Sequence, residues 1–278
     1  MTVLNTFVSD LRESVRLSAD ARSRFRLVMD FALSRLIGLT PRGQRNRVRE
    51  VRLRGGIKIR YRLNKGDLHS IREIWFQQAY RLPFADPSGV LLDLGANIGM
   101  TSLWLAKNYS ITRVIAVEPD PANAALVRQN LEVNGITGEV LEAAIGPKEL
   151  MARFEFSEHS NLGKLSERGS LVPMITIGRI IQKFAVTRLA LIKIDIEGSE
   201  QELFNGPTEW LTCTDAIIIE FHPTIIDDRL TRLVSSQGFK FIPAHSLFPD
   251  NMACFIRVKL NPAWVSVDPT VPACGTAT

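Results

Sequence analysis

The stretch from Val90 to Trp104, VLLDLGANIGMTSLW, constrains the fold more than any other part of this sequence. An apolar run ends at Asp93, a turn with Gly95 and Gly99 follows, and apolar residues then recur at helical spacing. This pattern predicts a buried strand, a tight turn and the start of a helix. In an open α/β sheet, ligands bind where loops leave the carboxyl ends of strands. We therefore expect the first ligand contacts at this turn.

Short apolar runs alternate with helical patterns along most of the chain. Strands are expected at 90–94, 113–117, 140–144, 151–156, 189–194, 216–221, 239–242 and 253–258. Helices are expected at 68–80, with Asp67 as its cap, and at 98–108, 121–134, 177–184, 199–204 and 225–237, and a long loop at 157–173. Apolar, β-branched strands of this kind predict a mostly parallel sheet with helices on both faces. The last two strands are expected to form an antiparallel hairpin at one edge.

The chain divides into three expected parts. Residues 1–66 should form an extension of amphipathic helices and a β-hairpin around Gly55 and Gly56. Residues 67–260 should form the main domain, which is long enough to bury one large core. Residues 261–278, with three prolines and small polar residues, are expected to be a disordered tail.

The cysteines and the charge distribution limit the kinds of site and partner that this chain can have. The three cysteines are scattered, so neither a disulfide framework nor a zinc site is expected, and with no signal peptide or membrane span evident we expect a cytoplasmic protein. Basic residues crowd one short region: Arg42, Arg45, Arg47, Arg49, Arg52, Arg54, Lys58, Arg60 and Arg62. This region is either a solvated hairpin face or a patch that attracts an anionic membrane, an acidic substrate or nucleic acid.

The turn and the next strand end suggest a cofactor. The turn lacks the G-x-G-x-x-G pattern of dinucleotide sites, and Asp93 beside it favours a cationic group over a pyrophosphate. Glu118 ends the following strand, where a carboxylate can accept both hydroxyls of an adenosine ribose. An adenosine ligand with a cationic appendage is predicted, and S-adenosylmethionine fits that description.

Three motifs together resemble the FkbM-type family of S-adenosylmethionine-dependent methyltransferases. They are LLDLGANIGMTSL at 91–103, VEPDP at 117–121 and IKIDIEGSE at 192–200, and the similarity runs from roughly Asp67 to Phe241. The resemblance implies a class I methyltransferase fold, with a seven-stranded sheet in the order 3-2-1-4-5-7-6. It also implies methylation of hydroxyl groups on natural products or glycans, with S-adenosyl-L-methionine as cofactor.

The resemblance assigns site residues by position. The cofactor-binding residues would be Asp93, Gly95, Ala96, Asn97, Gly99, Glu118 and Pro119. Asp195 and Glu197 would lie at the end of the fourth strand, facing the transferred methyl group. One departure is Gly178, where relatives often have an aspartate, and this puts the local helix start and substrate contacts in doubt.

Methylation of an alcohol requires a group that takes up the hydroxyl proton. The candidates are Asp195, Glu197, Glu220 and His222, because two neighbouring strands deliver them to one edge of the sheet. Two structural alternatives stay open: Asp195 caps the next helix, or His222 is only a hydrogen-bonded residue at a strand end. No metal is expected, although the same atoms could bind a divalent cation.

Other functions stay open as well. The basic region would suit a nucleic-acid methyltransferase, but Asp195-Ile-Glu-Gly stands where base-modifying enzymes commonly carry an Asp/Asn-Pro-Pro-aromatic segment, so no nucleic acid is expected. A second alternative is a non-catalytic partner protein that binds S-adenosylmethionine. The methyl acceptor is expected to be a sugar, a glycan or a related metabolite, and the sequence does not identify it.

Overall fold

The computed structural model of the protein describes residues 3–35, 46–84, 86–155, 164–165, 169–222, 228–242 and 251–258. The expected tail at 261–278 and most of the expected 157–173 loop lie outside the described residues. None of the helices in the described ranges combines the length and the apolar character needed to cross a bilayer.

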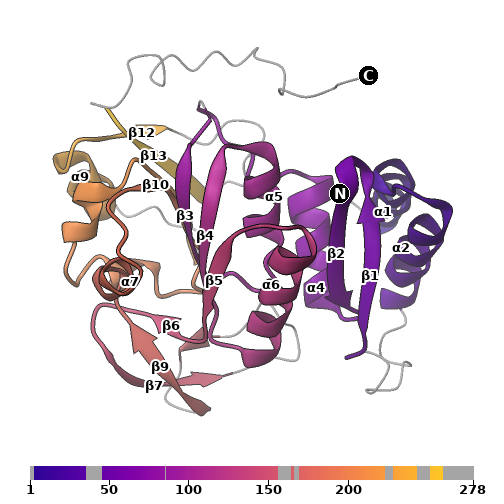
Figure 1. The fold of residues 1–278 in the computed structure, drawn as a ribbon, viewed down its shortest axis with the longest axis horizontal. Coiled ribbons are helices and arrows are strands. Elements are labelled where there is room, and N and C mark those ends of the chain that lie inside the picture. The colour runs from indigo at the N-terminus through magenta and orange to yellow at the C-terminus, as the bar shows by residue number, and fades with distance from the viewer. Residues whose placement is uncertain are drawn as a thin grey trace.

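A seven-stranded sheet forms the centre of the molecule (Figure 1). Its strands are β3 (Gly89–Leu94), β4 (Ile111–Val117), β5 (Gly138–Leu141), β10 (Leu189–Ile194), β11 (Ala216–Glu220), β12 (Phe239–Ile242) and β13 (Met252–Arg257). They lie in the order β12-β13-β11-β10-β3-β4-β5, and β13 alone runs antiparallel to its neighbours β11 and β12. Counted along the chain within this sheet, the order from β5 to β12 reads 3-2-1-4-5-7-6.

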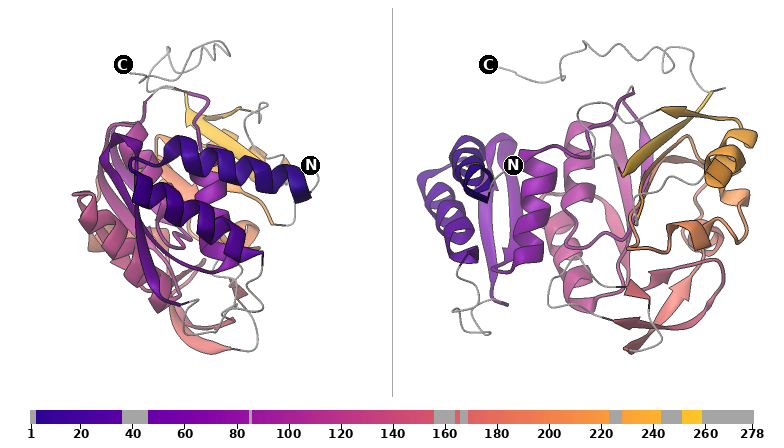
Figure 2. Two further views of the ribbon diagram at one scale, coloured as in Figure 1. Left: turned by 90° about the vertical axis from the view of Figure 1, so that its right-hand side faces the viewer. Right: turned by 180° about the vertical axis from the view of Figure 1, so that it is seen from behind.

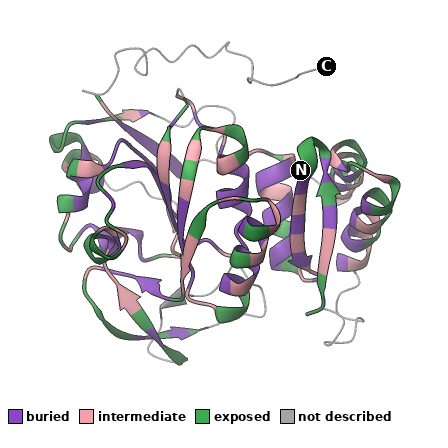
Figure 3. Ribbon diagram, viewed as in Figure 1, coloured by how far each residue is buried: buried purple, intermediate pink, exposed green. Residues whose placement is uncertain are grey.

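Helices cover both faces of this sheet. The first face carries α4 (Lys65–Ile71), the π-helical turn η3 (Arg72–Phe76), α5 (Met100–Asn108) and α6 (Pro121–Val133). The second carries α7 (Ile177–Lys183), α8 (Glu200–Leu203), the 3-10 turn η4 (Glu209–Cys213) and α9 (Asp228–Ser236). Successive strand side chains alternate between the two layers, so Leu91 packs in the first core and Leu92 in the second. Figure 3 shows the buried residues that follow these strands and the inner helix faces.

The helix expected at 68–80 is divided and capped differently from the prediction. It begins as α4 and continues as η3. The helix starts earlier than expected because Asn64 rather than Asp67 caps it. The Asn64 side chain accepts a hydrogen bond from the Asp67 backbone N–H. Asp67 instead binds the Arg62 guanidinium with both carboxylate oxygens. This pair ties the start of α4 to the N-terminal layer.

The N-terminal layer consists of α1 (Val3–Leu17), α2 (Ala21–Ser34) and the hairpin β1 (Val48–Leu53) and β2 (Ile57–Arg62), with the turn η2 (Arg54–Gly56) between the strands. The alternation predicted for this hairpin is seen in β2, where every second residue is buried. The layer lies beside α4 and α6, at the end of the molecule opposite β12 (Figures 1 and 2). Its apolar side chains belong to the same core as α5 and α6.

Side chains cover both outer edges of this hairpin. On β2, the amide of Asn130 on α6 exchanges two hydrogen bonds with the backbone of Arg60, and the amide of Asn134, the C-cap of α6, exchanges two with that of Lys58, all at 2.7–3.0 Å. On β1, the backbone of Arg52 donates to the Ser23 hydroxyl and accepts from the Ala19 N–H. These groups therefore make the hydrogen bonds that neighbouring strands would otherwise make with the two edges of the hairpin.

Part of the basic region is neutralised within the N-terminal layer. Arg49 pairs with Asp30, and Arg60 pairs with Glu50 at 3.0 Å. Arg62 makes the two-oxygen contact with Asp67 described above. Arg42 and Arg45 lie outside the described residues.

A small second sheet lies below the main one in Figure 1. It comprises β6 (Ala144–Ile145), β7 (Leu150–Glu155), β8 (Lys164–Leu165) and β9 (Ser170–Ile175), in the order β6-β9-β7-β8. The strand expected at 140–144 is therefore two strands: β5 ends at Leu141 in the main sheet, and Ala144 pairs with Met174 of β9.

Candidate active site

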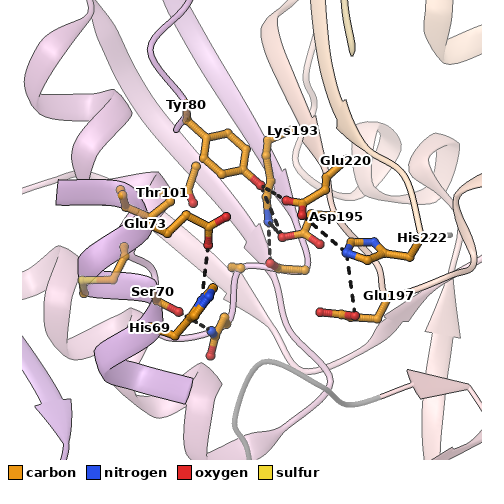
Figure 4. A pocket seen from close by; sticks show the side chains of 15 residues that line it. His69, Ser70, Glu73, Tyr80, Thr101, Lys193, Asp195, Glu197, Glu220 and His222 are labelled. Atoms are coloured by element: carbon orange, nitrogen blue, oxygen red, sulfur yellow. Dashed lines mark hydrogen bonds and ion pairs between the residues drawn. The ribbon is translucent and has the colours of Figure 1, made fainter. Parts of the chain in front are cut away.

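A cavity of about 290 Å³ opens where β3, β10 and β11 end, beneath α4 and η3 (Figure 4). Its lining residues are His69, Ser70, Glu73, Ile74, Tyr80, Gly95, Ala96, Asn97, Met100, Thr101, Lys193, Asp195, Glu197, Glu220 and His222. This is the edge of the sheet where the sequence predicts ligand binding, since parallel strands present their carboxyl ends there.

The turn after β3 uses its own N–H groups within the protein. The N–H groups of Gly95 and Ala96 both donate to the carbonyl of Val117 at 3.0 Å. The Asn97 N–H donates to Glu118 at 2.8 Å. A pyrophosphate site needs such N–H groups to be free. These three N–H groups are therefore not available to a pyrophosphate.

Gly95 is required because the chain after β10 passes directly over it. Gly95 has a φ of 75°, and a Cβ placed there would lie 1.8 Å from the carbonyl oxygen of Asp195. No larger residue fits without moving the backbone that carries Asp195. The turn at Gly95 and the acidic residues after β10 are thus fixed relative to one another.

Lys193 is the buried cation at the centre of the site. Its ammonium lies 3.3 Å from Asp93 and 3.2 Å from Asp195, and it donates to the Gly95 carbonyl at 2.6 Å. Lys193 and Asp93 are register partners on the adjacent strands β10 and β3. Burial alone would lower the pKa of Lys193, but the carboxylates of Asp195 and Asp93 raise it above its ordinary value. The lysine is therefore charged.

Asp93 does not lie on the cavity. Its side chain is fully buried, accepts a hydrogen bond of 2.5 Å from the Ser102 hydroxyl, and faces Lys193 with its other oxygen. We expected this carboxylate to contact a cationic ligand. Instead it pairs with Lys193 and, through the hydrogen bond from Ser102, holds the start of α5 in place.

Four of the predicted residues meet on the opposite wall of the cavity. Asp195 and Glu197 follow β10, Glu220 ends β11, and His222 lies two residues farther on. The His222 Nε2 atom lies 3.4 Å from Glu220 Oε1 and 4.0 Å from Glu197 Oε2. The Tyr80 hydroxyl lies 3.1 Å from Glu220 and 3.3 Å from Asp195. Figure 4 shows these side chains pointing toward one another.

Glu200 holds the other side of the His222 ring. It is buried at the start of α8, and its Oε1 atom lies 3.4 Å from His222 Nδ1. The same oxygen accepts the backbone N–H groups of Ile196 and Gly198. Hydrogen bonds with His222 and the Gly198 backbone lower the pKa of Glu200 despite the opposing effect of burial. Asp195 caps no helix, since Ser199 occupies the N-cap position of α8.

The crowding of carboxylates raises proton affinities in the cavity. Burial, followed by the charges of nearby carboxylates, raises the pKa of Glu73 to about 8 and that of Glu197 to about 7. Hydrogen bonds to Glu200 and Glu220 raise the pKa of His222 to about 11. Glu73 and Glu197 therefore hold protons more tightly than carboxylates in water do.

Glu118 supports the turn from behind. Its carboxylate accepts hydrogen bonds from the N–H groups of Asn97 and Asp120, at 2.8 and 2.9 Å. Only 6% of the residue is exposed, and burial raises its pKa to about 8. Neither Glu118 nor Pro119 lines the cavity, and Gly99 lies buried against Val127 at the start of α5.

The structure thus brings seven of the predicted residues to one cavity. They are Gly95, Ala96, Asn97, Asp195, Glu197, Glu220 and His222. The sequence did not assign Glu73, Tyr80 or Lys193 to the site. A signal for Lys193 was present, because it precedes Asp195 by two residues in a strand and shares its side. Glu73 and Tyr80 come from a helical segment more than a hundred residues earlier, and no local pattern links them to β11.

Comparison with known proteins gives consistent matches. The sequence profile of the methyltransferase FkbM domain matches residues 93–241. The hexuronic acid methyltransferase AglP of Haloferax volcanii is 26% identical over 180 residues, which cover 60% of this chain and 74% of AglP. The 31-O-demethyl-FK506 methyltransferase FkbM of Streptomyces tacrolimicus is 23% identical over 197 residues, covering 57% of this chain and 75% of that protein.

A solved structure is also similar. The methyltransferase FkbM of Methylobacillus flagellatus has a TM-score of 0.47 and 17% identity, and the match covers 90% of this chain but only 59% of the solved chain. The domain profile includes the turn after β3, the cavity wall from Asp195 to His222 and the strands between them. From this match over more than half of its length, the chain belongs to the FkbM family of methyltransferases.

Proposed function

We propose that the protein is an S-adenosylmethionine-dependent O-methyltransferase that acts on a hydroxyl group of a sugar, a glycan or a related metabolite. The observation that carries this proposal is a single cavity with the glycine turn on one wall and a carboxylate and imidazole cluster on the other. The first wall suits the methyl donor, and the second suits a hydroxyl group that must lose its proton.

The residues of the turn fit the proposed cofactor. The Asn97 side-chain oxygen is buried and has no hydrogen-bond partner among the described residues, so it can accept a hydrogen bond from an ammonium group. The excess of carboxylates around Asp195 suits a ligand with a positive sulfur and a positive nitrogen. Gly95, Ala96 and Asn97 would hold the methionine part, and Glu118 would act at the ribose or through its bond to the Asn97 N–H.

When bound, the cofactor supplies a methyl group whose carbon bonds to the acceptor oxygen while the carbon–sulfur electron pair stays on sulfur and the hydroxyl proton leaves. The protein must therefore align the acceptor and take up that proton. Asp195, Glu197, Glu220 and His222 are the proposed catalytic residues. Tyr80 fixes two of these carboxylates by lying within hydrogen-bond distance of both.

The acceptor class follows from the same cluster. Carboxylates facing a phosphodiester would repel it, whereas a neutral hydroxyl can donate a hydrogen bond to them. The relative AglP is by name a hexuronic acid methyltransferase, which supports testing carbohydrate acceptors first. The pairing of Arg49, Arg60 and Arg62 with carboxylates of this chain gives the nucleic-acid alternative no added support.

Two measurements test the proposal. Calorimetry should detect S-adenosylmethionine binding, and Glu118→Ala should weaken it roughly 2–10-fold, since a hydrogen bond contributes about 0.5–1.5 kcal/mol. Glu142→Ala, at an exposed carboxylate, should leave binding unchanged. Formation of S-adenosylhomocysteine should then depend on a hydroxylated acceptor such as a hexuronic acid glycoside. Absence of cofactor binding in the wild-type protein would refute the proposal.

A further inference from the structure

Three side chains at the back of the cavity have the spacing of metal ligands. One donor atom each from Asp195, Glu220 and His222 lies within 4.8 Å of the other two. In an octahedral shell with bonds of about 2.1 Å, ligand atoms lie about 3 Å apart when adjacent and about 4.2 Å apart when opposite. The spacing of the three atoms is close to this range, so small side-chain rotations could bring them onto one ion.

The donors come from rigid positions. Asp195 and Glu220 stand at the ends of the neighbouring parallel strands β10 and β11, which pair directly through Ile194 and Ile219. His222 follows β11 by two residues. Because paired strands hold their ends at a fixed separation, the spacing of these ligands does not depend on a loop that closes over the ion.

Groups behind two of the three donors orient them independently of the cluster. Buried Glu200 lies against His222 Nδ1, which can donate a hydrogen bond to it, so Nε2 is the ring nitrogen that faces the cavity and that would give up its proton to a bound ion. Asn251 donates to Glu220 Oε1 at 3.0 Å. Carboxylate–histidine pairs of this type commonly support the ligands of metal sites.

Local charge also favours an added cation. Glu73 and Glu197 line the same cavity, so four carboxylates surround it. The cation Lys193 is committed to Asp93 and to the carbonyl of Gly95 as well as to Asp195. A divalent ion could take the place of protons that this crowding of carboxylates attracts.

We propose that Asp195, Glu220 and His222 bind one divalent cation of the Mg²⁺ or Mn²⁺ class, leaving other positions of its shell for water and the acceptor hydroxyl. Two carboxylates with one imidazole suit these ions, since oxygen ligands predominate. The inference rests on the proposed function for its role: the ion would hold the acceptor oxygen and make its proton easier to remove. The proton would pass to the Glu197 carboxylate, whose Oε2 atom lies 4.0 Å from His222 Nε2.

The test uses Mn²⁺ itself as the probe and needs neither cofactor nor acceptor. The full-length protein, stripped with chelator, is titrated with Mn²⁺ while the electron paramagnetic resonance signal of free ion is recorded. One bound ion per chain is expected. Glu220→Gln and His222→Gln should each weaken binding roughly tenfold or more, because each removes one ligand from a preformed set.

A matched control comes from the opposite wall. His69 also lines the cavity but lies outside the ligand set, so His69→Gln should bind Mn²⁺ like the wild-type protein. Excess Mg²⁺ should displace Mn²⁺ from the wild-type site. Equal Mn²⁺ binding by the wild-type protein, Glu220→Gln and His222→Gln would overturn the proposal, as would no binding at millimolar Mn²⁺.

The outcome is separable from that of the proposed function. S-adenosylmethionine binding is measured by calorimetry in the presence of chelator. Cofactor binding without Mn²⁺ binding would overturn the metal site alone and leave the methyltransferase proposal intact. Mn²⁺ binding that depends on Glu220 and His222 supports the site, whatever the cofactor result.

Discussion

The His222 imidazole is held by Glu200 on one side and faces the cavity on the other, with 3.4 Å between Nδ1 and the Glu200 carboxylate oxygen. Glu200 is itself fixed by the backbone N–H groups of Ile196 and Gly198, in the turn that carries Glu197. One buried carboxylate therefore sets the orientation of the histidine ring and the course of the acidic turn.

Replacing Glu200 by glutamine should weaken the hold of this side chain on the His222 ring. The amide carries no negative charge, so the pKa of His222 should fall from about 11, because the Glu200 hydrogen bond is the largest cause of the increase. Nitrogen-15 NMR of labelled histidine in chelator-treated protein measures this pKa. Glu202→Gln, outside the cavity lining on the same helix, serves as control. An unchanged His222 titration in Glu200→Gln would contradict this assignment.

Replacing Lys193 by methionine should destabilise the protein by roughly 3–5 kcal/mol, since it leaves buried carboxylates without their cation. Asp93 is fully buried and Lys193 only 2% exposed, so solvent cannot replace the lost partner. Urea denaturation measures the change. Adding Asp93→Asn to Lys193→Met should restore part of the loss. Arg128→Met, at an exposed pair with Glu142, should cost at most about 1 kcal/mol.

Gly95 and Gly56 form a matched pair for testing close approach. Both have positive φ, 75° and 76°, but a Cβ at Gly56 meets nothing within 4 Å, whereas at Gly95 it meets the Asp195 carbonyl. Gly56→Ala should therefore cost only the left-handed conformation, about 1–2 kcal/mol. Gly95→Ala should cost more and also weaken S-adenosylmethionine binding. Equal effects of the two substitutions on the thermal unfolding temperature would contradict this prediction, because they would mean that the backbone at Asp195 moves away from the added Cβ at little cost.

Glu118 should make stability depend on pH. Burial raises its folded-state pKa to about 8 from an ordinary value of 4.5, so the folded protein binds this proton more tightly than the unfolded chain does. The resulting stabilisation is fully present below pH 4.5 and is lost as the pH rises through about 8. Glu118→Gln lacks this contribution. The free energy of unfolding of the wild-type protein, relative to Glu118→Gln, should fall across that interval, and parallel curves would contradict it.

The sequence predicted the main sheet well because its strands are short apolar runs between clear helical patterns. The expected strand at 189–194 matches β10, and the end of β3 is at Leu94 as expected. Strand adjacency also explains why Asp195, Glu220 and His222 were expected together. Of the second sheet, only the strand expected at 151–156 was predicted, as β7, whereas β9 begins inside the expected loop. The other pairings were missed because β6 has two residues and its partner Met174 is thirty residues away.

The role of Asp93 shows why a prediction from neighbouring residues in the sequence can be wrong. An acidic residue at the end of a strand was interpreted as a ligand contact, since the sequence does not display its neighbour across the sheet. The register of β3 and β10 places Lys193 beside it, and that ion pair removes the carboxylate from the cavity. Tyr80 and Glu73 escaped prediction for a related reason, because the segment from α4 to Tyr80 reaches the site only through tertiary packing.

The N-terminal hairpin has a consequence for how copies of this chain meet in solution. A two-stranded sheet normally offers two rows of unpaired backbone groups, and such rows invite strands from other molecules. Here Asn130 and Asn134 occupy one row, and Ser23 with Ala19 occupies part of the other. These backbone groups of the hairpin are therefore not available to pair with a strand of another molecule, and we expect the two asparagines to limit edge-to-edge association.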